Sequence, residues 1–229
     1  MPKLLDIYKK LERRFGFQNW WPGETPDEII IGAILTQNTN WRNVERAISN
    51  LKKHDSISLE SIYATDAKKL ARLVRPSGFY KQKAKRLKSF ASHVHNFYGG
   101  SLADFFSKDA GSLRRELLSM DGIGKETADS IILYAAEKPV FVVDAYTKRV
   151  YSRVYGLSEE PDYDSLQKAI ESEIPCNVRL YKDFHAQIVE LAKNYCRKIP
   201  LCTDCPLRSV CIRGKSGEVE IISREKKQV

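Results

Sequence analysis

The chain carries the stretch LLSMDGIGKETA at residues 117–128. Apolar residues at helical spacing precede and follow it, which predicts a helix, a tight turn with two glycines and a second helix. Gly122 and Gly124 permit left-handed or tight backbone geometry and leave amide hydrogens uncovered. Where the second helix begins, those amides and the cation of Lys125 can bind a phosphate group without contacting a base. The alternative is that the turn only connects two helices.

Helical periodicity extends over most of the chain on both sides of this turn. It predicts an all-α fold of about ten short helices joined by loops with glycine and proline, and no convincing strands. Residues 25–28 read Thr-Pro-Asp-Glu, a capping signal for a nearly all-apolar helix that should lie in the middle of a bundle. The other helices are expected at 4–15, 41–51, 66–74, from 81 onward, and at 101–106, 113–120, 127–136, 145–155, 163–174 and 181–195.

Basic residues gather in one segment of the chain. There are 38 Lys and Arg against 29 Asp and Glu, a net charge of +9, and residues 68–88 contain nine of these cations and no acid. The rest of the chain is therefore balanced in charge. A patch of this kind favours a polyanionic partner.

The composition excludes several classes of protein. Hydrophobic residues make up 42% of the chain and aromatic residues 10%, which excludes a disordered or fibrous protein. The longest apolar run, at 29–35, is far shorter than the ~20 residues that cross a bilayer, and the N-terminus is too highly charged for a secretion signal. We therefore expect a soluble intracellular protein with no membrane partner.

Four of the five cysteines lie within sixteen residues near the C-terminus, in the pattern C-x5-C-x2-C-x5-C: Cys196, Cys202, Cys205 and Cys211. Thiolates this close repel one another unless a metal ion or an iron cluster binds them. Reduced structural thiols are the alternative. The spacing alone does not separate zinc from a 4Fe-4S cluster, but the long outer gaps are unusual for a zinc ribbon and favour iron–sulfur. Cys176 stands apart and is expected to be a small buried residue.

A short apolar run at 139–143 ends in the carboxylate of Asp144. The plainer interpretation is that Asp144 caps the helix expected at 145–155. The functional interpretation is that this acid lies at the mouth of a cleft and faces the DNA that the glycine turn binds. The two roles are compatible.

The Gly122-Ile123-Gly124 turn, Val143-Asp144 and the four-cysteine tail, in this order and at these separations, resemble the helix-hairpin-helix DNA glycosylases of the endonuclease III superfamily. The likeness extends over residues 27–211. It implies a monomer that acts on damaged double-stranded DNA in the cytoplasm, associated with the nucleoid. It also implies two helical domains with a DNA-binding cleft between them: a six-helix barrel-like domain at 23–136 with the hairpin, an iron–sulfur domain at 1–22 plus 137–214, and a polar tail at 215–229.

The same resemblance assigns a 4Fe-4S cluster to the four clustered cysteines and the catalytic role to Asp144, although the first gap between cysteines is one residue shorter than in endonuclease III. Bifunctional members carry a lysine directly after the basic residue of the hairpin, and its amine attacks the sugar. Here Lys125 is that basic residue and Glu126 stands where the nucleophile would be. Because a carboxylate cannot form an imine, the resemblance implies a monofunctional enzyme without lyase activity.

Four further stretches closely resemble the bacterial 3-methyladenine DNA glycosylases of this superfamily: residues 20–22, 35–39, 74–80 and 124–126. In that branch the residues that match Trp20, Trp21, Pro22 and Trp41 line the pocket for the extruded base. Some members of the branch lack the iron–sulfur cysteines, whereas this chain keeps them.

Physical chemistry favours such a pocket. An alkylated purine is a flat ring with delocalised positive charge, which indole faces attract by ~0.5–2 kcal/mol. Core packing is the commoner role of any one tryptophan. All three tryptophans nevertheless fall within 22 residues, two of them beside a proline in an expected loop, where aromatic rings with a polar handle often form binding sites.

The sequence therefore favours a glycosylase that extrudes an alkylated purine and hydrolyses its N-glycosidic bond. Asp144 would stabilise the oxocarbenium-like sugar and orient or deprotonate the water. Gln37 would fill the gap in the base stack, or it is only an exposed amide at a helix end. Two alternatives stay open: an endonuclease III-like glycosylase and lyase for damaged or mismatched pyrimidines, and a non-catalytic module that senses damage. Backbone phosphates would be bound by Gly122, Gly124, Lys125, Arg75, Lys81 and Lys85, although a charge run is more often a solvated helix face.

Overall fold

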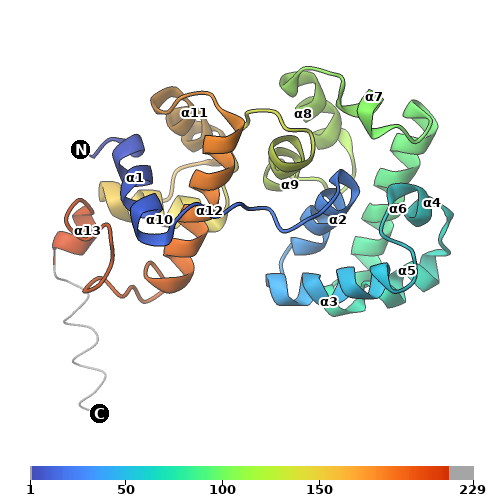
Figure 1. The fold of residues 1–229 in the computed structure, drawn as a ribbon, viewed down its shortest axis with the longest axis horizontal. Coiled ribbons are helices and arrows are strands. Elements are labelled where there is room, and N and C mark those ends of the chain that lie inside the picture. The colour runs from blue at the N-terminus through green and yellow to red at the C-terminus, as the bar shows by residue number, and fades with distance from the viewer. Residues whose placement is uncertain (1, 217–229) are drawn as a thin grey trace, which may run out of the picture. The chain divides into compact units, whose positions relative to one another are not determined.

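The computed structural model describes residues 2–216 of the chain. Every regular element in this range is helical, with thirteen α-helices, a short 3-10 helix and a π-helical turn, and no strand occurs in it (Figure 1). The prediction of an all-α fold is therefore confirmed. The described residues fold as two compact units, one from residues 21–140 and the other from residues 2–20 together with 141–216. The polar tail expected at 215–229 lies almost entirely outside the described residues.

The unit of residues 21–140 is built around α2 (Pro26–Thr36), which packs against α3, α6, α9 and the π-helical turn η2. Thr25 caps this helix by accepting from the Glu28 backbone N–H at 3.2 Å, and all residues from Ile30 to Leu35 are buried. A central, apolar helix is what the capping signal predicts. The remaining elements are α3 (Trp41–Lys52), α4 (Leu59–Ala64), α5 (Ala67–Leu73), η1 (Arg75–Ser77), α6 (Tyr80–Tyr98), α7 (Leu102–Phe106), α8 (Ala110–Ser119), α9 (Lys125–Ser130) and η2 (Ile131–Ala135).

The second unit joins the N-terminal helix to the C-terminal half of the chain. Its elements are α1 (Leu4–Phe15), α10 (Ala145–Tyr155), α11 (Tyr163–Glu173), α12 (Val178–Asn194) and α13 (Ile212–Lys215). The long helix α12 packs against both α1 and α10. Two backbone N–H groups of the N-terminal segment donate across to carboxylates of the C-terminal half, from Leu4 to Glu173 and from Gln18 to Asp183, each at 2.7 Å.

Several element boundaries differ from those expected, for local reasons. The helix expected at 127–136 changes character at Ile131, where the Ala136 N–H bonds to the carbonyl of Ile131, five residues back. Helix α12 begins three residues before its expected start because Asn177 caps it through its side chain. The short helices α4 and α13 were not expected from the sequence.

None of the helices in residues 2–216 combines the length and the apolar character that crossing a bilayer requires.

Candidate functional site

The glycine turn between α8 and α9 has the predicted helix–turn–helix form, and its two glycines do different work. Gly122 has a φ of 78°, in the left-handed region, and a Cβ built there would lie 2.7 Å from Cδ of Arg86. Gly124 precedes α9 with ordinary extended geometry, φ −89° and ψ 176°, and a Cβ there would meet no atom within 4 Å. Gly122 is therefore required by the fold. At Gly124 the space beside the start of α9 is open, and that a phosphate binds there stays a prediction.

The Gln37 side chain, at the end of α2, is bonded through both of its polar atoms. Its Nε2 donates to the Gly122 carbonyl at 2.9 Å and to the Thr127 hydroxyl at 3.0 Å. Its Oε1 accepts from Nη1 of Arg86 at 2.5 Å. The turn after α2 is thereby connected to the hairpin and to α6. That Gln37 fills a gap in a base stack stays a prediction.

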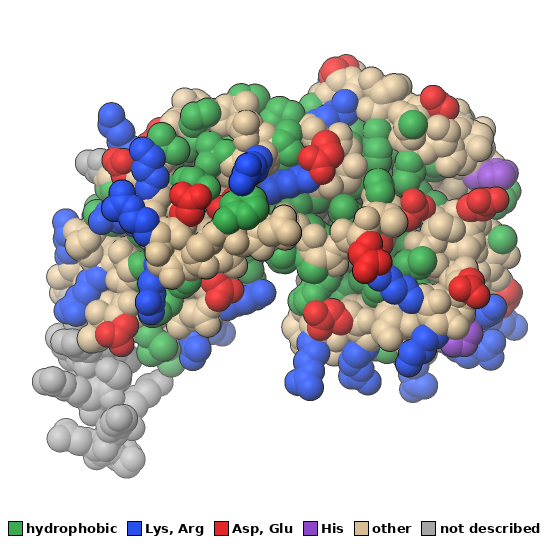
Figure 2. All heavy atoms as spheres, in the orientation of Figure 1, with side chains coloured by type: hydrophobic (Ala, Val, Ile, Leu, Met, Phe, Trp, Pro, Cys, Tyr) green, Lys and Arg blue, Asp and Glu red, His purple; other side chains and the backbone are tan. Residues whose placement is uncertain are grey.

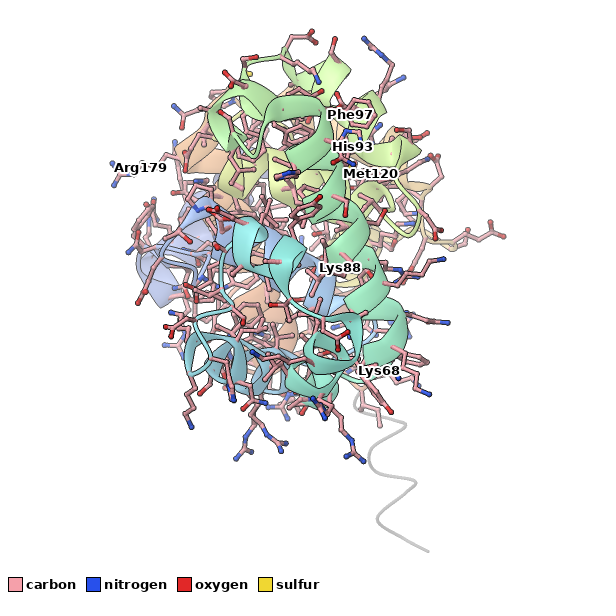
Figure 3. The ribbon with its side chains drawn as sticks, turned by 90° about the vertical axis from the view of Figure 1, so that its right-hand side faces the viewer. Lys68, Lys88, His93, Phe97, Met120 and Arg179 are labelled. Carbon is pink, nitrogen blue, oxygen red and sulfur yellow. The ribbon has the colours of Figure 1, made fainter. Side chains whose placement is uncertain are left out.

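The basic segment faces both outward and inward, which its sequence did not reveal. Lys83 is buried, and its Nζ donates to the carbonyls of Leu35 at 2.8 Å and Ser77 at 2.6 Å, while burial lowers its pKa to about 8. Nζ of Lys88 donates to the carbonyls of Tyr63 and Thr65. In Figure 3, Lys88 lies midway along α6 and Lys68 near the lower end of this unit. Together with Arg86, three of the nine cations therefore bind groups of the protein itself.

The outward cations include all three that the sequence assigned to phosphates. Arg75 and Lys81 are exposed, and exposed Lys85 lies 3.6 Å from Asp121 of the hairpin turn. Figure 2 shows Lys and Arg side chains projecting in a row along the edge of this unit that α3 and α5 form. The remaining outward cations of the segment are Lys68, Lys69 and Arg72.

Phe79 is an exposed aromatic residue of the basic segment that the sequence interpretation did not name as a candidate site residue. Its ring is 65% exposed, and its backbone has a φ of 45°, a conformation that a bulky residue adopts only when its surroundings impose it. It stands between Gly78 and α6, and the cations Arg75 and Lys81 flank it. Phe79 lies in the stretch 74–80 that carries the family resemblance, but periodicity does not distinguish its Gly-Phe pair from one with a buried aromatic residue.

Two of the three tryptophans form a pair beside α2. Trp21 and Trp41 meet edge to face with ring centroids 5.3 Å apart, and Trp21 also contacts Tyr134 of η2 at 5.2 Å. Both indoles lie over Gly32, where a Cβ would come within 3.3 Å of Nε1 of Trp21. Trp21 and Trp41 are half-buried. Tyr134, which the sequence interpretation did not single out, forms the buried support of this pair.

Trp20 belongs to the other unit, although it adjoins Trp21 in the sequence. Its ring lies 5.5 Å from that of His185 on α12, and Nζ of Lys193 lies 5.9 Å from its centroid. Pro22 is exposed. That Trp20, Trp21, Pro22 and Trp41 line one pocket therefore stays a prediction.

Asp144 caps α10, as the plainer interpretation had it, and one carboxylate oxygen does this work. Oδ1 accepts from the Thr147 N–H at 2.7 Å and from the Thr147 hydroxyl at 2.8 Å, while Oδ2 lies 3.6 Å from Nε2 of His185. The side chain is only 14% exposed. Burial alone raises the pKa of Asp144, but His185 and the two Thr147 bonds outweigh it and hold the pKa below its ordinary value. The acid is thus a firmly positioned carboxylate that stays ionised at neutral pH.

The four clustered cysteines line one cavity, together with Arg153, Arg208 and Arg213. Nη1 of Arg153 donates to Sγ of Cys196 at 3.4 Å, and the Gly214 N–H donates to Sγ of Cys211 at 3.3 Å. Burial and the neighbouring thiolates raise the pKa of Cys205 to about 11. Four thiols that line one cavity and repel one another when ionised, two of them accepting from N–H donors, are a donor set that fits an iron–sulfur cluster. Among the described residues, no three His, Cys, Asp or Glu side chains are placed to hold a single metal ion.

The expectation for Cys176 is wrong. The residue is exposed, because it lies in the loop that leads into α12, directly before the capping residue Asn177.

Comparison with known proteins places these features in a family. The model of the HhH-GPD superfamily of base excision DNA repair proteins matches residues 31–176, which include the second half of α2, the hairpin and Asp144. The chain belongs to this superfamily. It is a DNA repair glycosylase by family, and the predicted membership of the endonuclease III superfamily is confirmed at that level.

Individual relatives match this chain over most of its length. A candidate DNA repair glycosylase of Methanocaldococcus jannaschii is 50% identical over 208 residues, which cover 90% of this chain and 94% of that protein. The structure of the 3-methyladenine DNA glycosylase of H. pylori, bound to 1,N6-ethenoadenine, is 36% identical with a TM-score of 0.73, and the match covers 84% of this chain and 98% of that one. A non-covalent complex of endonuclease III with DNA has a TM-score of 0.79 at 21% identity, covering 94% of this chain and 98% of that one, and shows the shared fold.

Proposed function

We propose that this glycosylase removes alkylated purines such as 3-methyladenine by hydrolysis and leaves an abasic site. The observation that carries the substrate class is the pair formed by Trp21 and Trp41, half-buried aromatic faces held over Gly32. The likeness at 36% identity to a 3-methyladenine DNA glycosylase with a purine adduct bound supports the same class. A stacked, cation-attracting pocket selects an electron-poor cationic ring over a neutral pyrimidine.

In this proposal the unit of residues 21–140 holds the DNA. Backbone amides beside Gly124, together with Lys125, Arg75, Lys81 and Lys85, bind phosphates and carry no sequence preference. Extruding a base costs a few kcal/mol, which stacking on the two indoles helps to offset. The exposed ring of Phe79 fits the space between neighbouring bases, since a flat apolar side chain in a basic surface stacks where a base has left.

The chemistry requires little of the protein, because a cationic base is a good leaving group. The bond from the sugar C1′ to the base nitrogen breaks, and its electron pair neutralises the departing base. The ionised carboxylate of Asp144 stabilises the positive charge that develops on the sugar. A water oxygen then bonds to C1′ and gives its proton to Asp144 or to solvent.

We propose further that Cys196, Cys202, Cys205 and Cys211 bind a 4Fe-4S cluster, whose iron–thiolate bonds would hold the loop from 196 to 211 beside α10. The proposal rests on four thiols lining one cavity with three arginines. Protein purified without chelators should be brown and contain about four irons per chain. Iron and zinc are measured by atomic emission on the same sample. A colourless preparation with one zinc per chain contradicts the cluster.

Duplexes that each carry one defined lesion test the proposed function. We expect free base from the 3-methyladenine duplex and strand breaks only after alkali treatment, because Glu126 offers no amine to the sugar. The matched control is Glu126→Lys, which supplies an exposed amine in the first turn of α9 and should produce breaks without alkali, trappable by borohydride.

Two outcomes contradict the proposal and favour its rivals. Release of damaged or mismatched pyrimidines, with spontaneous breaks from the parent protein, indicates a glycosylase and lyase of the endonuclease III type. Binding to lesion duplexes without release of any base indicates a damage-sensing module.

A further inference from the structure

We infer that Arg86 is a positioning residue that holds the Gln37 turn and the hairpin in one arrangement before DNA arrives. The inference rests on the proposed DNA binding by the hairpin, and it does not depend on which base is removed. Arg86 lies inside the basic segment 68–88, where its sequence suggests one more phosphate contact. Its position in the fold indicates a different task.

The geometry carries this inference. Nη1 of Arg86 donates to Oε1 of Gln37 at 2.5 Å. Nε2 of Gln37 in turn donates to the Gly122 carbonyl at 2.9 Å and to the Thr127 hydroxyl at 3.0 Å. The aliphatic part of Arg86 covers Gly122, since a Cβ there would lie 2.7 Å from Cδ and 2.9 Å from Cγ. One guanidinium on α6 thus fixes an amide side chain that in turn bonds to the hairpin turn at Gly122 and to the first turn of α9 at Thr127.

A second inward cation on the same face of α6 supports the assignment. Lys83 precedes Arg86 by three residues, one helical turn, and binds the carbonyls of Leu35 and Ser77. The two cations are close enough for Arg86 to help lower the pKa of Lys83. Lys83 therefore fixes the end of α2 and the 3-10 turn before Phe79, while Arg86 fixes the turn that follows α2. Both hold elements that flank the proposed DNA-binding surface.

Such a network pre-organises the surface. A turn and a hairpin that already hold their bound arrangement lose less conformational freedom on binding. A positioning residue acts through its partners, so its effect disappears once the partner is gone. A phosphate contact acts on DNA directly, so its effect adds to that of Gln37 and lowers the salt dependence of binding.

A double-mutant cycle separates these two roles. The full chain and the variants Arg86→Ala, Gln37→Ala and Arg86→Ala/Gln37→Ala are compared for affinity to a duplex with a tetrahydrofuran abasic analogue, at several salt concentrations. We expect each single variant to lose about tenfold in affinity, because a charge-assisted hydrogen bond in the network is gone. The double variant should lose little more than either single one, and the salt slope should stay unchanged.

Lys81→Ala is the matched control on the same helix, since Lys81 is exposed and has no role in the network. It should lower the salt slope by about 0.9 and add to the effect of Gln37→Ala. If Arg86→Ala behaves like this control, Arg86 is a phosphate contact and the inference is wrong. Thermal unfolding is measured on every variant, and a lower Tm with unchanged affinity also overturns it. Because no base is released in this assay, a failure of the alkylpurine assignment leaves the result interpretable.

Discussion

Asp144→Asn should release no detectable base from a lesion duplex, while it binds that duplex about as tightly as the parent protein does. The carboxylate is the only group in the proposal that opposes the positive charge on the sugar, and removing one pre-organised electrostatic contact lowers rates by about 10²–10³-fold or more. Single-turnover release of a labelled base measures the rate. Fluorescence anisotropy on a tetrahydrofuran duplex measures the affinity.

Asparagine is the right substitution because it keeps the structural role of the residue. Oδ1 of Asp144 accepts both Thr147 bonds, and the amide oxygen of asparagine can accept them in the same way. Asparagine caps helices as well as aspartate does, so α10 should begin where it does now. What changes is the charge near Oδ2. If release and affinity fall by the same factor, Asp144 acts on structure or binding and the catalytic assignment fails.

His185→Gln gives a complementary result through pH. His185 is one of the groups that hold the pKa of Asp144 below its ordinary value, so its loss should raise that pKa. Because the ionised form is the active one, the rate falls as pH drops through the pKa of Asp144, and this acid limb should move to higher pH in the variant. The parent protein should keep its rate until the pH approaches the lowered pKa of Asp144. An unchanged acid limb indicates that a different group limits the rate at low pH.

The parts of this molecule that were predictable are those encoded locally. The Thr25 cap, the apolar run of α2 and the glycine turn each carry their structural signal within a few residues, and the structure has all three. Asp144 belongs to the same class, since a carboxylate at the end of an apolar run is a helix cap wherever it occurs. The all-α fold followed from such signals taken together.

The parts that were not predictable depend on which way a side chain points. Lys83 and Arg86 cannot be told from their exposed neighbours in the sequence. Each points inward because it has an acceptor there, which is a carbonyl of α2 for Lys83 and the amide of Gln37 for Arg86. The pair Trp20 and Trp21 shows the same limit, because adjacent residues belong to different units. Phe79 could be recognised as unusual only from its backbone conformation and the exposure of its ring. The three cations of the basic segment that were assigned to phosphates are exposed, whereas the inward direction of Lys83 and Arg86 was not foreseen.

Replacing each glycine of the hairpin by alanine should affect a different property, stability for Gly122 and DNA affinity for Gly124. Gly122→Ala should lower the free energy of unfolding, because a left-handed backbone is unfavourable by about 1–2 kcal/mol for alanine and its Cβ displaces Arg86. Gly124→Ala should leave stability unchanged, because its backbone suits any residue and its Cβ meets nothing. Its methyl group instead occupies the space where a phosphate approaches the amides of α9, so affinity for DNA should fall about tenfold or more.

Chemical denaturation and anisotropy on the same three proteins decide this prediction. An equal loss of stability in both variants would indicate that the hairpin only connects two helices, which is the alternative that its sequence leaves open. Unchanged affinity of Gly124→Ala for DNA would indicate that the hairpin is not part of the DNA-binding surface. A double variant separates the two causes of the stability loss expected for Gly122→Ala. In Arg86→Ala/Gly122→Ala the displaced side chain is absent, so the remaining loss of stability comes from the left-handed backbone alone. The difference between Gly122→Ala in the two backgrounds then measures how firmly Arg86 is held over the turn.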